Sequence, residues 1–290
     1  MFDRRTALRG AGVLTAALVT AGCQGRPEAQ LRLAAGESGG FFWEFSGLLA
    51  AAADRADSAR ITPLQTEGSV DNLEALRSGR AELALSLIDT VYDSPARDDL
   101  TAIGCVYENY FQVAVRGDSA VRSMEDLRGR TVSTGAPGSG ATSLSARVLA
   151  AAGLAGTGDL RGVELSMHDA AEGLAAGTVD AVMWAGGLPT PAFTDTGADI
   201  RLLDLTSVVA QLRRSFGTTY EAVPVPADVY GRHPAVTTVG VANLLLAHRD
   251  VADESSMSTS TIAAAYSSAT SRCASNRFAT PTVVTAGCRP

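Results

Sequence analysis

Short apolar runs alternate with amphipathic stretches along most of the chain. The apolar runs at 31–35, 60–65 and 81–87 have the length of buried strands. The stretches at 41–56 and 70–78 repeat apolar residues at helical spacing. Because strands that alternate with helices form mainly parallel sheets, this pattern predicts an α/β fold with a largely parallel sheet.

A second series of the same kind follows further along the chain. Two predicted strands, 102–106 and 111–116, lead into it, and an amphipathic helix is predicted at 143–152. The other elements predicted in this series are a short helix and turn at 124–130, strands at 130–133, 162–166, 179–184 and 201–205, and helices at 170–176 and 208–216.

The chain of 290 residues is long enough for two lobes of about 100 to 150 residues each. We predict that residues 31–117 begin the first lobe, that residues 118–216 form the second, and that residues 217–251 return to the first.

Four turns rich in small residues follow strands of this pattern, at 36–40, 66–69, 135–142 and 184–191. Ligands of open α/β sheets bind at the carboxyl ends of strands, where such turns lie, and small residues let the backbone approach a ligand closely. Each of the first three turns precedes a predicted helix, whose N-terminus attracts anions. We therefore predict a ligand cleft at these turns.

The turn from Gly135 to Thr142 has the glycine spacing of a phosphate loop, but Ala141 stands where that loop needs its lysine. The chain contains 24 arginines and no lysine. A phosphate-loop lysine, a lysine Schiff base and a Ser-Lys dyad are therefore excluded. The loop is predicted to hold a small anionic or polar group through backbone N–H and hydroxyl groups; the alternative is a tight turn that packs a helix on the sheet.

The N-terminus indicates an export signal. Three arginines, in the outline of a twin-arginine signal, precede an apolar run at 11–21, which is shorter than the about 20 residues that span a bilayer. Residues 19–23 resemble a lipobox. We expect residues 1–22 to be a lipoprotein signal peptide, Cys23 to carry lipid, and residues 23–30 to be a tether, which makes the protein extracytoplasmic and lipid-anchored. An ordinary signal peptide with a chance cysteine is the alternative.

Composition and charge narrow the function classes. The net charge is −7, which argues against nucleic-acid binding, because that function relies on clustered positive charge. No Cys-x-x-Cys spacing or nucleophile motif occurs, so we expect no metal, no cofactor and no catalytic residue. The adjacent pair His168 and Asp169 is a weak candidate for base catalysis, and Asp169 is expected instead to cap a helix at Ala170.

The segment 252–290 breaks the pattern. It contains no leucine and is rich in serine, threonine and alanine, which is typical of a low-complexity or disordered end. A shift of reading frame near Ala252 is a second explanation.

An ordered set of motifs resembles the TAXI family of solute-binding proteins, which serve TRAP transporters. The set comprises Gly39-Gly40-Phe41, the segment 66–73, Leu76-Arg77-Ser78-Gly79, the segment 126–130, Gly135 to Gly140, the segment 180–184 and the segment 187–191. The resemblance covers about residues 31–251. It implies a type II periplasmic-binding-protein fold, with two α/β lobes that close on a ligand in the cleft between them.

The resemblance also implies a ligand and its binding residues. Family members are associated with glutamate or related dicarboxylates, so the expected ligand is a small carboxylate or an amino acid. By position, the implied ligand-binding residues are Gly39, Gly40, Phe41, Thr66, Gly68, Ser69, Asn72, Ser139, Gly140, Thr142, Trp184 and Gly187. Tyr107 or Tyr110 is expected to wall the cleft near the crossover. The alternatives are core packing for Trp184 and a helix N-cap for Asn72.

The implied partner is the integral membrane permease of a TRAP transporter. Three other functions stay open on sequence grounds: a solute sensor for a signalling partner, a binding protein of an ABC-type importer, and an enzyme on the same fold.

Overall fold

The computed structural model describes residues 29–249, apart from Ser58 and Thr157. The expected lipid site at Cys23 and the segment 252–290 lie outside the described residues.

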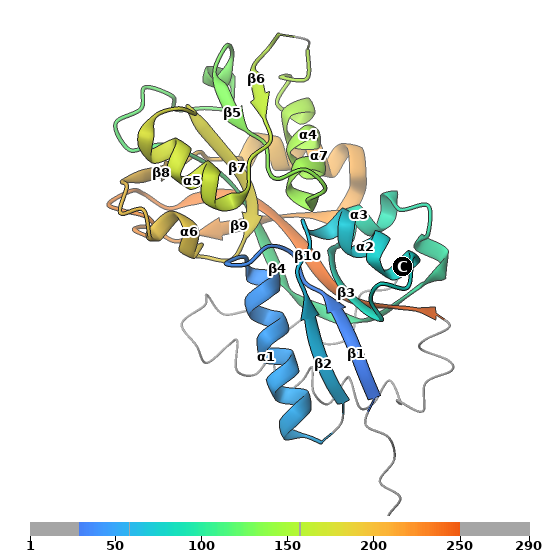
Figure 1. Ribbon diagram of the computed structural model, residues 1–290. Coiled ribbons are helices and arrows are strands. Elements are labelled where there is room, and N and C mark those ends of the chain that lie inside the picture. The colour runs from blue at the N-terminus through green and yellow to red at the C-terminus, as the bar shows by residue number, and fades with distance from the viewer. Residues whose placement is uncertain (1–28, 58, 157, 250–290) are drawn as a thin grey trace, which may run out of the picture.

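The first lobe is built from three parallel strands and three helices (Figure 1). Its elements are β1 (Ala29–Ala34), α1 (Phe41–Arg55), β2 (Ala59–Leu64), α2 (Ser69–Arg77), β3 (Leu83–Leu87) and α3 (Ile88–Asp93). The predicted helices at 41–56 and 70–78 are confirmed to within one residue, because their apolar residues share one face. That face of α1 buries Phe45, Leu49 and Ala52.

The second lobe repeats the strand-helix pattern. Its elements within the predicted range 118–216 are β5 (Thr131–Ser133), α4 (Gly140–Ala151), β6 (Arg161–Val163), α5 (Met167–Ala176), β7 (Ala181–Gly186), α6 (Pro191–Thr194), β8 (Ile200–Leu202) and α7 (Thr206–Phe216). Strand β9 (Tyr220–Val225) follows, and the predicted boundary between the lobes at residue 217 stays a prediction. Short 3-10 turns lie at Arg97–Asp99, Glu125–Leu127 and Gly217–Thr219.

Two long antiparallel strands, β4 (Leu100–Arg116) and β10 (Val236–His248), run through both lobes. They join one sheet of order β2-β1-β3-β10-β4-β7-β5-β6, with β8 on β4 and β9 on β10. Two sequence predictions are wrong here. The sheet is mixed rather than largely parallel, because both long strands pair antiparallel with their neighbours. The strands predicted at 102–106 and 111–116 are one strand.

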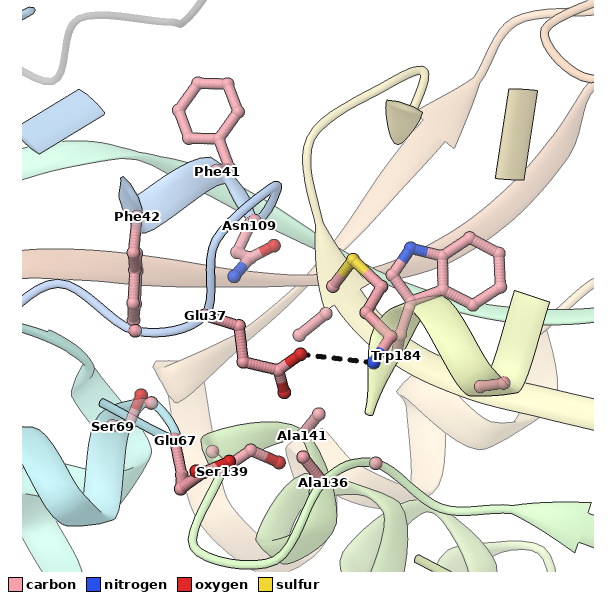
Figure 2. Close-up of a pocket in the computed structure, with 18 of the residues that line it drawn as sticks. Glu37, Phe41, Phe42, Glu67, Ser69, Asn109, Ala136, Ser139, Ala141 and Trp184 are labelled. Atoms are coloured by element: carbon pink, nitrogen blue, oxygen red, sulfur yellow. Dashed lines mark hydrogen bonds between the residues drawn. The ribbon is translucent and has the colours of Figure 1, made fainter. Parts of the chain in front are cut away.

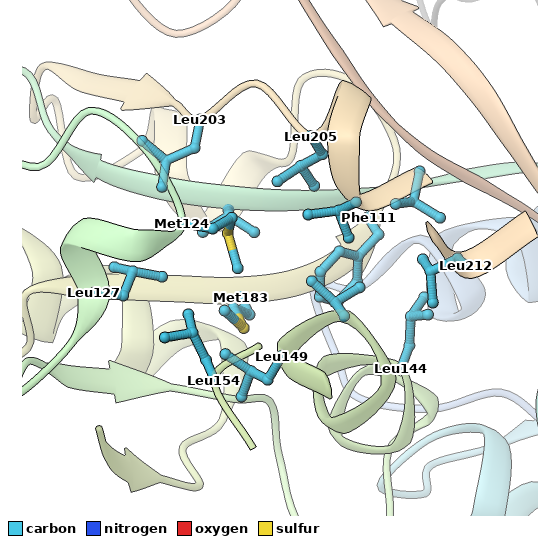
Figure 3. Close-up of a cluster of buried hydrophobic side chains, with 14 of the residues drawn as sticks. Phe111, Met124, Leu127, Leu144, Leu149, Leu154, Met183, Leu203, Leu205 and Leu212 are labelled. Carbon is cyan, nitrogen blue, oxygen red and sulfur yellow. The ribbon is translucent and has the colours of Figure 1, made fainter. Parts of the chain in front are cut away.

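Each lobe has its own hydrophobic core. In the first lobe, α1 packs on the leucines of β1 and β3, with Phe45 fully buried. In the second lobe, a larger cluster joins α4 and α7 to the strands and includes Phe111, Met183 and Leu212 (Figure 3). Leu87, at the end of β3, contributes to the second cluster, so the two cores meet where β3 ends.

A buried polar network also joins the lobes. Arg147 on α4 lies 3.3 Å from the carboxylate of Asp89 on α3 and donates a hydrogen bond of 2.5 Å to the hydroxyl of Tyr220. It also pairs with Asp93. The Tyr220 hydroxyl donates to Asp89 at 3.0 Å. Burial raises the pKa of Asp89, although the charge of Arg147 opposes this shift.

Candidate ligand-binding site

A cavity of about 90 Å³ lies between the lobes, at the carboxyl ends of β1, β2, β5 and β7 (Figure 2). All four predicted turns reach it or lie beside it. It is lined from the first lobe by the turn after β1 and the start of α2, and from the second lobe by the loop Gly135 to Ala141 and by β7. The sequence prediction of a ligand cleft at the turns is consistent with this cavity.

Four helices begin at the cavity wall. Gly40, Gly68 and Ser139 are the N-caps of α1, α2 and α4, and Met167 is the first residue of α5. The first N–H groups of a helix have no partner within the helix, and the dipole places partial positive charge there. Side chains do not cap α1 or α2. The cavity is therefore suited to an anionic group.

Two buried side chains present unpaired oxygen atoms at this cavity. Asn109 on β4 is 3% exposed, and its Oδ1 has no hydrogen-bond partner. Ser133 at the end of β5 is fully buried, and its Oγ has none either. A buried polar atom without a partner costs about 1–3 kcal/mol. Both atoms are thus positioned to gain a partner when a polar ligand enters.

The charged side chains that line the cavity are acidic. Glu37, in the turn after β1, is half-buried, and Glu67 is exposed at the rim. The Met167 N–H donates to Glu37 Oε2 at 3.2 Å, which is the dashed line in Figure 2. Burial raises the pKa of Glu37, the Met167 N–H opposes this, and Glu67 and Asp169 raise it further. None of the described residues that line the cavity is Arg or His.

Aromatic rings form the remaining walls. Phe41 packs on Tyr107 at 4.2 Å between ring centroids, and Phe42 lies against the same tyrosine. On the opposite side, Trp184 stacks on Phe193 at 3.9 Å. The rings leave few polar groups in contact with a ligand, so those groups control what binds.

The lobes touch along the edges of the cavity. The Val70 N–H donates to the Gly138 carbonyl at 3.2 Å. A Cβ atom at Gly140 would lie 2.6 Å from Ser69 Oγ, and one at Gly187 would lie 2.8 Å from the Phe41 ring. A larger residue at either position would require the facing side chain to shift, so these glycines allow the two lobes to come into direct contact.

Seven of the twelve predicted ligand-binding residues line the cavity: Gly40, Phe41, Gly68, Ser69, Ser139, Gly140 and Trp184. Trp184 also belongs to the core of the second lobe. It is 2% exposed, and its indole N–H donates to Thr190 Oγ1 at 2.9 Å. Trp184 therefore both lines the cavity and packs in the core, so its position agrees with both interpretations.

The other five predicted residues are not among those that line the cavity, and three of them make hydrogen bonds within the surrounding turns and strands. Thr66 accepts the Gly36 N–H at 2.7 Å and donates to Asn72. Asn72 is fully buried and donates to the Leu85 carbonyl at 2.7 Å, so it is not a helix N-cap. Thr142 donates to the Ala136 carbonyl at 2.6 Å. Ligand contact by these three residues, and by Gly39 and Gly187, stays a prediction.

The cavity residues that were not singled out from the sequence include three with polar groups that bear on the site: Glu37, Asn109 and Ser133. Glu37 lies within a predicted turn, where its carboxylate gave a usable signal. Asn109 lies in the gap between the two predicted strands, 102–106 and 111–116. In the structure this gap is part of the continuous strand β4. Ser133 ends a predicted strand, and only the structure shows which way it points.

The pair considered for catalysis is arranged differently from a catalytic dyad. His168 is exposed and contacts Glu172 at 3.1 Å. Ser166, not Asp169, is the N-cap of α5, and its hydroxyl accepts the Asp169 N–H at 3.1 Å. The predicted cap at Asp169 is therefore wrong, because the helix begins at Met167.

A family model, that of the NMT1-like family, matches residues 33–258 and so spans most of the chain. The protein belongs to the NMT1-like family. The match includes all of the residues that line the cavity of this NMT1-like protein.

Solved structures share the fold of this NMT1-like protein. The periplasmic aliphatic sulphonate binding protein SsuA from Escherichia coli is 22% identical with a TM-score of 0.56, covering 87% of this chain and 76% of the other. The alkanesulfonate-binding protein SsuA from Xanthomonas axonopodis pv. citri, bound to MOPS, is 23% identical with a TM-score of 0.53 over 87% and 76%. An ancestral arginine-binding protein bound to arginine is 13% identical with a TM-score of 0.53, covering 87% and 95%. The predicted two-lobed α/β fold is thereby confirmed.

Two features are absent from the described residues, 29–249 apart from Ser58 and Thr157. Among these residues, no group of His, Cys, Asp and Glu side chains is arranged to hold a metal ion. Within the same range, no helix has the length and apolar character needed to cross a bilayer.

Proposed function

We propose that this protein is the extracytoplasmic solute-binding subunit of a TRAP transporter, of the TAXI type, and that it binds a small carboxylate such as glutamate by closure of its lobes. One observation carries the proposed binding of a carboxylate: a cavity between two lobes, at which four helices begin and two buried oxygen atoms lack partners. Helix N-termini and hydroxyl groups bind a carboxylate without a full counter-charge.

The lobe contacts support a closure mechanism. Ser69 and Gly140 come from different lobes and meet at the cavity, as do Val70 and Gly138. A ligand that contacts both lobes binds more tightly when the lobes are in contact than when they are apart, and so it stabilises the closed arrangement. The proposed contact residues are the seven predicted residues that line the cavity, together with Asn109 and Ser133.

An ABC-type importer is the second candidate partner. The solved structures with this fold include the substrate binding protein of an amino acid ABC transporter, which is 12% identical with a TM-score of 0.51. The TRAP proposal rests on the ordered turn motifs between Gly39 and Pro191. Permease genes next to the gene for this protein distinguish the two: TRAP membrane subunits support the first, and an ATPase subunit supports the second.

The test is isothermal titration calorimetry on the full mature chain with glutamate, glutamine, 2-oxoglutarate, glutarate and MOPS. Small-angle X-ray scattering with and without each compound reports closure. We expect at least one carboxylate to bind and to reduce the radius of gyration. If no compound in the set binds, the proposed function is wrong. Mass spectrometry of the membrane fraction tests the proposed lipid on Cys23.

A further inference from the structure

Resting on the proposed function, we infer that the solute carries an ammonium group as well as a carboxylate, and that Glu37 binds the ammonium. The ligand class is then an α-amino acid rather than the corresponding oxo acid or dicarboxylic acid. Two carboxylates, Glu37 and Glu67, line the cavity, and none of its described lining residues is cationic.

The position of Glu37 makes it the acceptor that a ligand meets inside the cavity. Figure 2 shows its carboxylate between Asn109 and the loop that contains Ala136, Ser139 and Ala141. One oxygen, Oε2, accepts the Met167 N–H at 3.2 Å. A carboxylate has about four lone-pair sites, so Glu37 retains capacity to accept an ammonium N–H.

A ligand that has a carboxylate but no cationic group is repelled by the negative charge of Glu37. Its negative charge would be placed beside a half-buried carboxylate with no side-chain counter-ion, and the low dielectric between the lobes strengthens that repulsion. An ammonium reverses the sign of the same interaction. Burial also leaves Glu37 with few competing water molecules, which strengthens a charge-assisted hydrogen bond.

The aromatic walls favour the same chemistry. Phe41 and Phe42 lie on the side of the cavity from which Glu37 projects, and Tyr107 packs on Phe41. The face of an aromatic ring attracts a cation. The starts of α2 and α4, at Ser69 and Gly140, are the places for the carboxylate. The carboxylate of Glu37 thus matches the ammonium end of a zwitterion, and the positive ends of the helix dipoles match its carboxylate end.

A structural role for Glu37 is the competing explanation. Its bond to Met167 crosses from the first lobe to α5, so the side chain also helps to hold the lobes together. The variant Glu37→Gln separates the two roles. Its amide oxygen still accepts the Met167 N–H, whereas its charge is lost.

The experiment uses pairs of compounds that differ in the ammonium group: L-glutamate with 2-oxoglutarate, and L-leucine with 4-methyl-2-oxopentanoate. Affinities are measured by calorimetry for the wild-type chain, for Glu37→Gln, and for the control Glu44→Gln. Glu44 lies in the first turn of α1, outside the cavity lining, and its replacement removes the same charge. Thermal unfolding establishes that each variant is folded.

We expect the amino acid of a pair to bind about 10- to 100-fold more tightly than its oxo acid in the wild type, as for one hydrogen bond between charged groups. Glu37→Gln removes most of this preference and Glu44→Gln keeps it. An oxo acid that binds as tightly as its amino acid overturns the inference and leaves the proposed function intact, as does an equal loss for both members of a pair in Glu37→Gln. Binding of neither member of either pair, with the wider compound set also inactive, overturns the proposed function.

Discussion

Replacement of Gly140 by alanine tests whether direct contact between the lobes is needed for binding. Gly140 is the first residue of α4, and its backbone is not in the left-handed region, so alanine adds no backbone strain. The new methyl group would lie 2.6 Å from Ser69 Oγ and 2.7 Å from Leu87 Cδ1, whereas ordinary contacts begin at 3.4 Å. The lobes must then move apart, or the side chains of Ser69 and Leu87 must both turn.

Both adjustments cost free energy. Ser69 Oγ accepts the buried Leu87 N–H at 3.1 Å, so rotation of this side chain leaves that N–H unpaired. Overpacking of this kind costs about 1–3 kcal/mol. The cost applies only where the lobes meet, and it corresponds to a loss of affinity of about 5- to 150-fold.

The assay combines calorimetry, with whichever compound of the titration set binds most tightly, with small-angle scattering of the free protein. We expect weaker binding and a larger radius of gyration for Gly140→Ala. Gly47→Ala is the matched control, because Gly47 lies within α1 and a Cβ there meets nothing within 4 Å. Wild-type affinity and an unchanged radius for Gly140→Ala would refute the reasoning.

Two further substitutions test the scaffold behind the cavity. Thr66→Val leaves the buried Gly36 N–H without its acceptor and should lower the free energy of unfolding in urea by about 1–3 kcal/mol; a change near zero contradicts the role assigned to the hydroxyl. Arg147→Met removes the cation beside Asp89, which is 1% exposed, and should cost about 3–5 kcal/mol at pH 7. Because burial raises the pKa of Asp89, its contribution to stability is present below the ordinary pKa of aspartate and is lost as the pH rises through the raised value. The deficit of Arg147→Met relative to wild type should therefore shrink in acid, and a deficit independent of pH would show that Asp89 is not the group responsible.

The elements that hydrophobic periodicity predicted well are those with one buried face. Helix α1 and strand β1 have such faces, and their predicted bounds are close to the observed ones. Strand β4 was divided in the prediction because Glu108 and Asn109 interrupt its apolar residues. In the structure these residues pair with Ala242 and Val241 of β10, so the strand continues. That pairing joins residues more than 130 positions apart, and local sequence carries no signal for it.

In the candidate site too, features set by local sequence were predictable and features set by contacts between distant residues were not. The turns before α1, α2 and α4 were predictable, because glycine-rich segments between a strand and a helix lie at one edge of a sheet. The directions of side chains were not. Thr66 and Asn72 point into the first lobe and bond to each other, while Asn109 reaches the cavity from a strand in the middle of the sheet. Such differences depend on how the lobes face one another.

The antiparallel ribbon of β4 and β10 has a consequence for the motion of the lobes. Both strands run through both lobes, and their register shifts between Ala242 and Leu244 and again between Leu245 and Leu246. Bulges of this kind bend a strand and increase its local twist. In the proposed closure mechanism, the lobes therefore open or close only if this shared ribbon changes its twist.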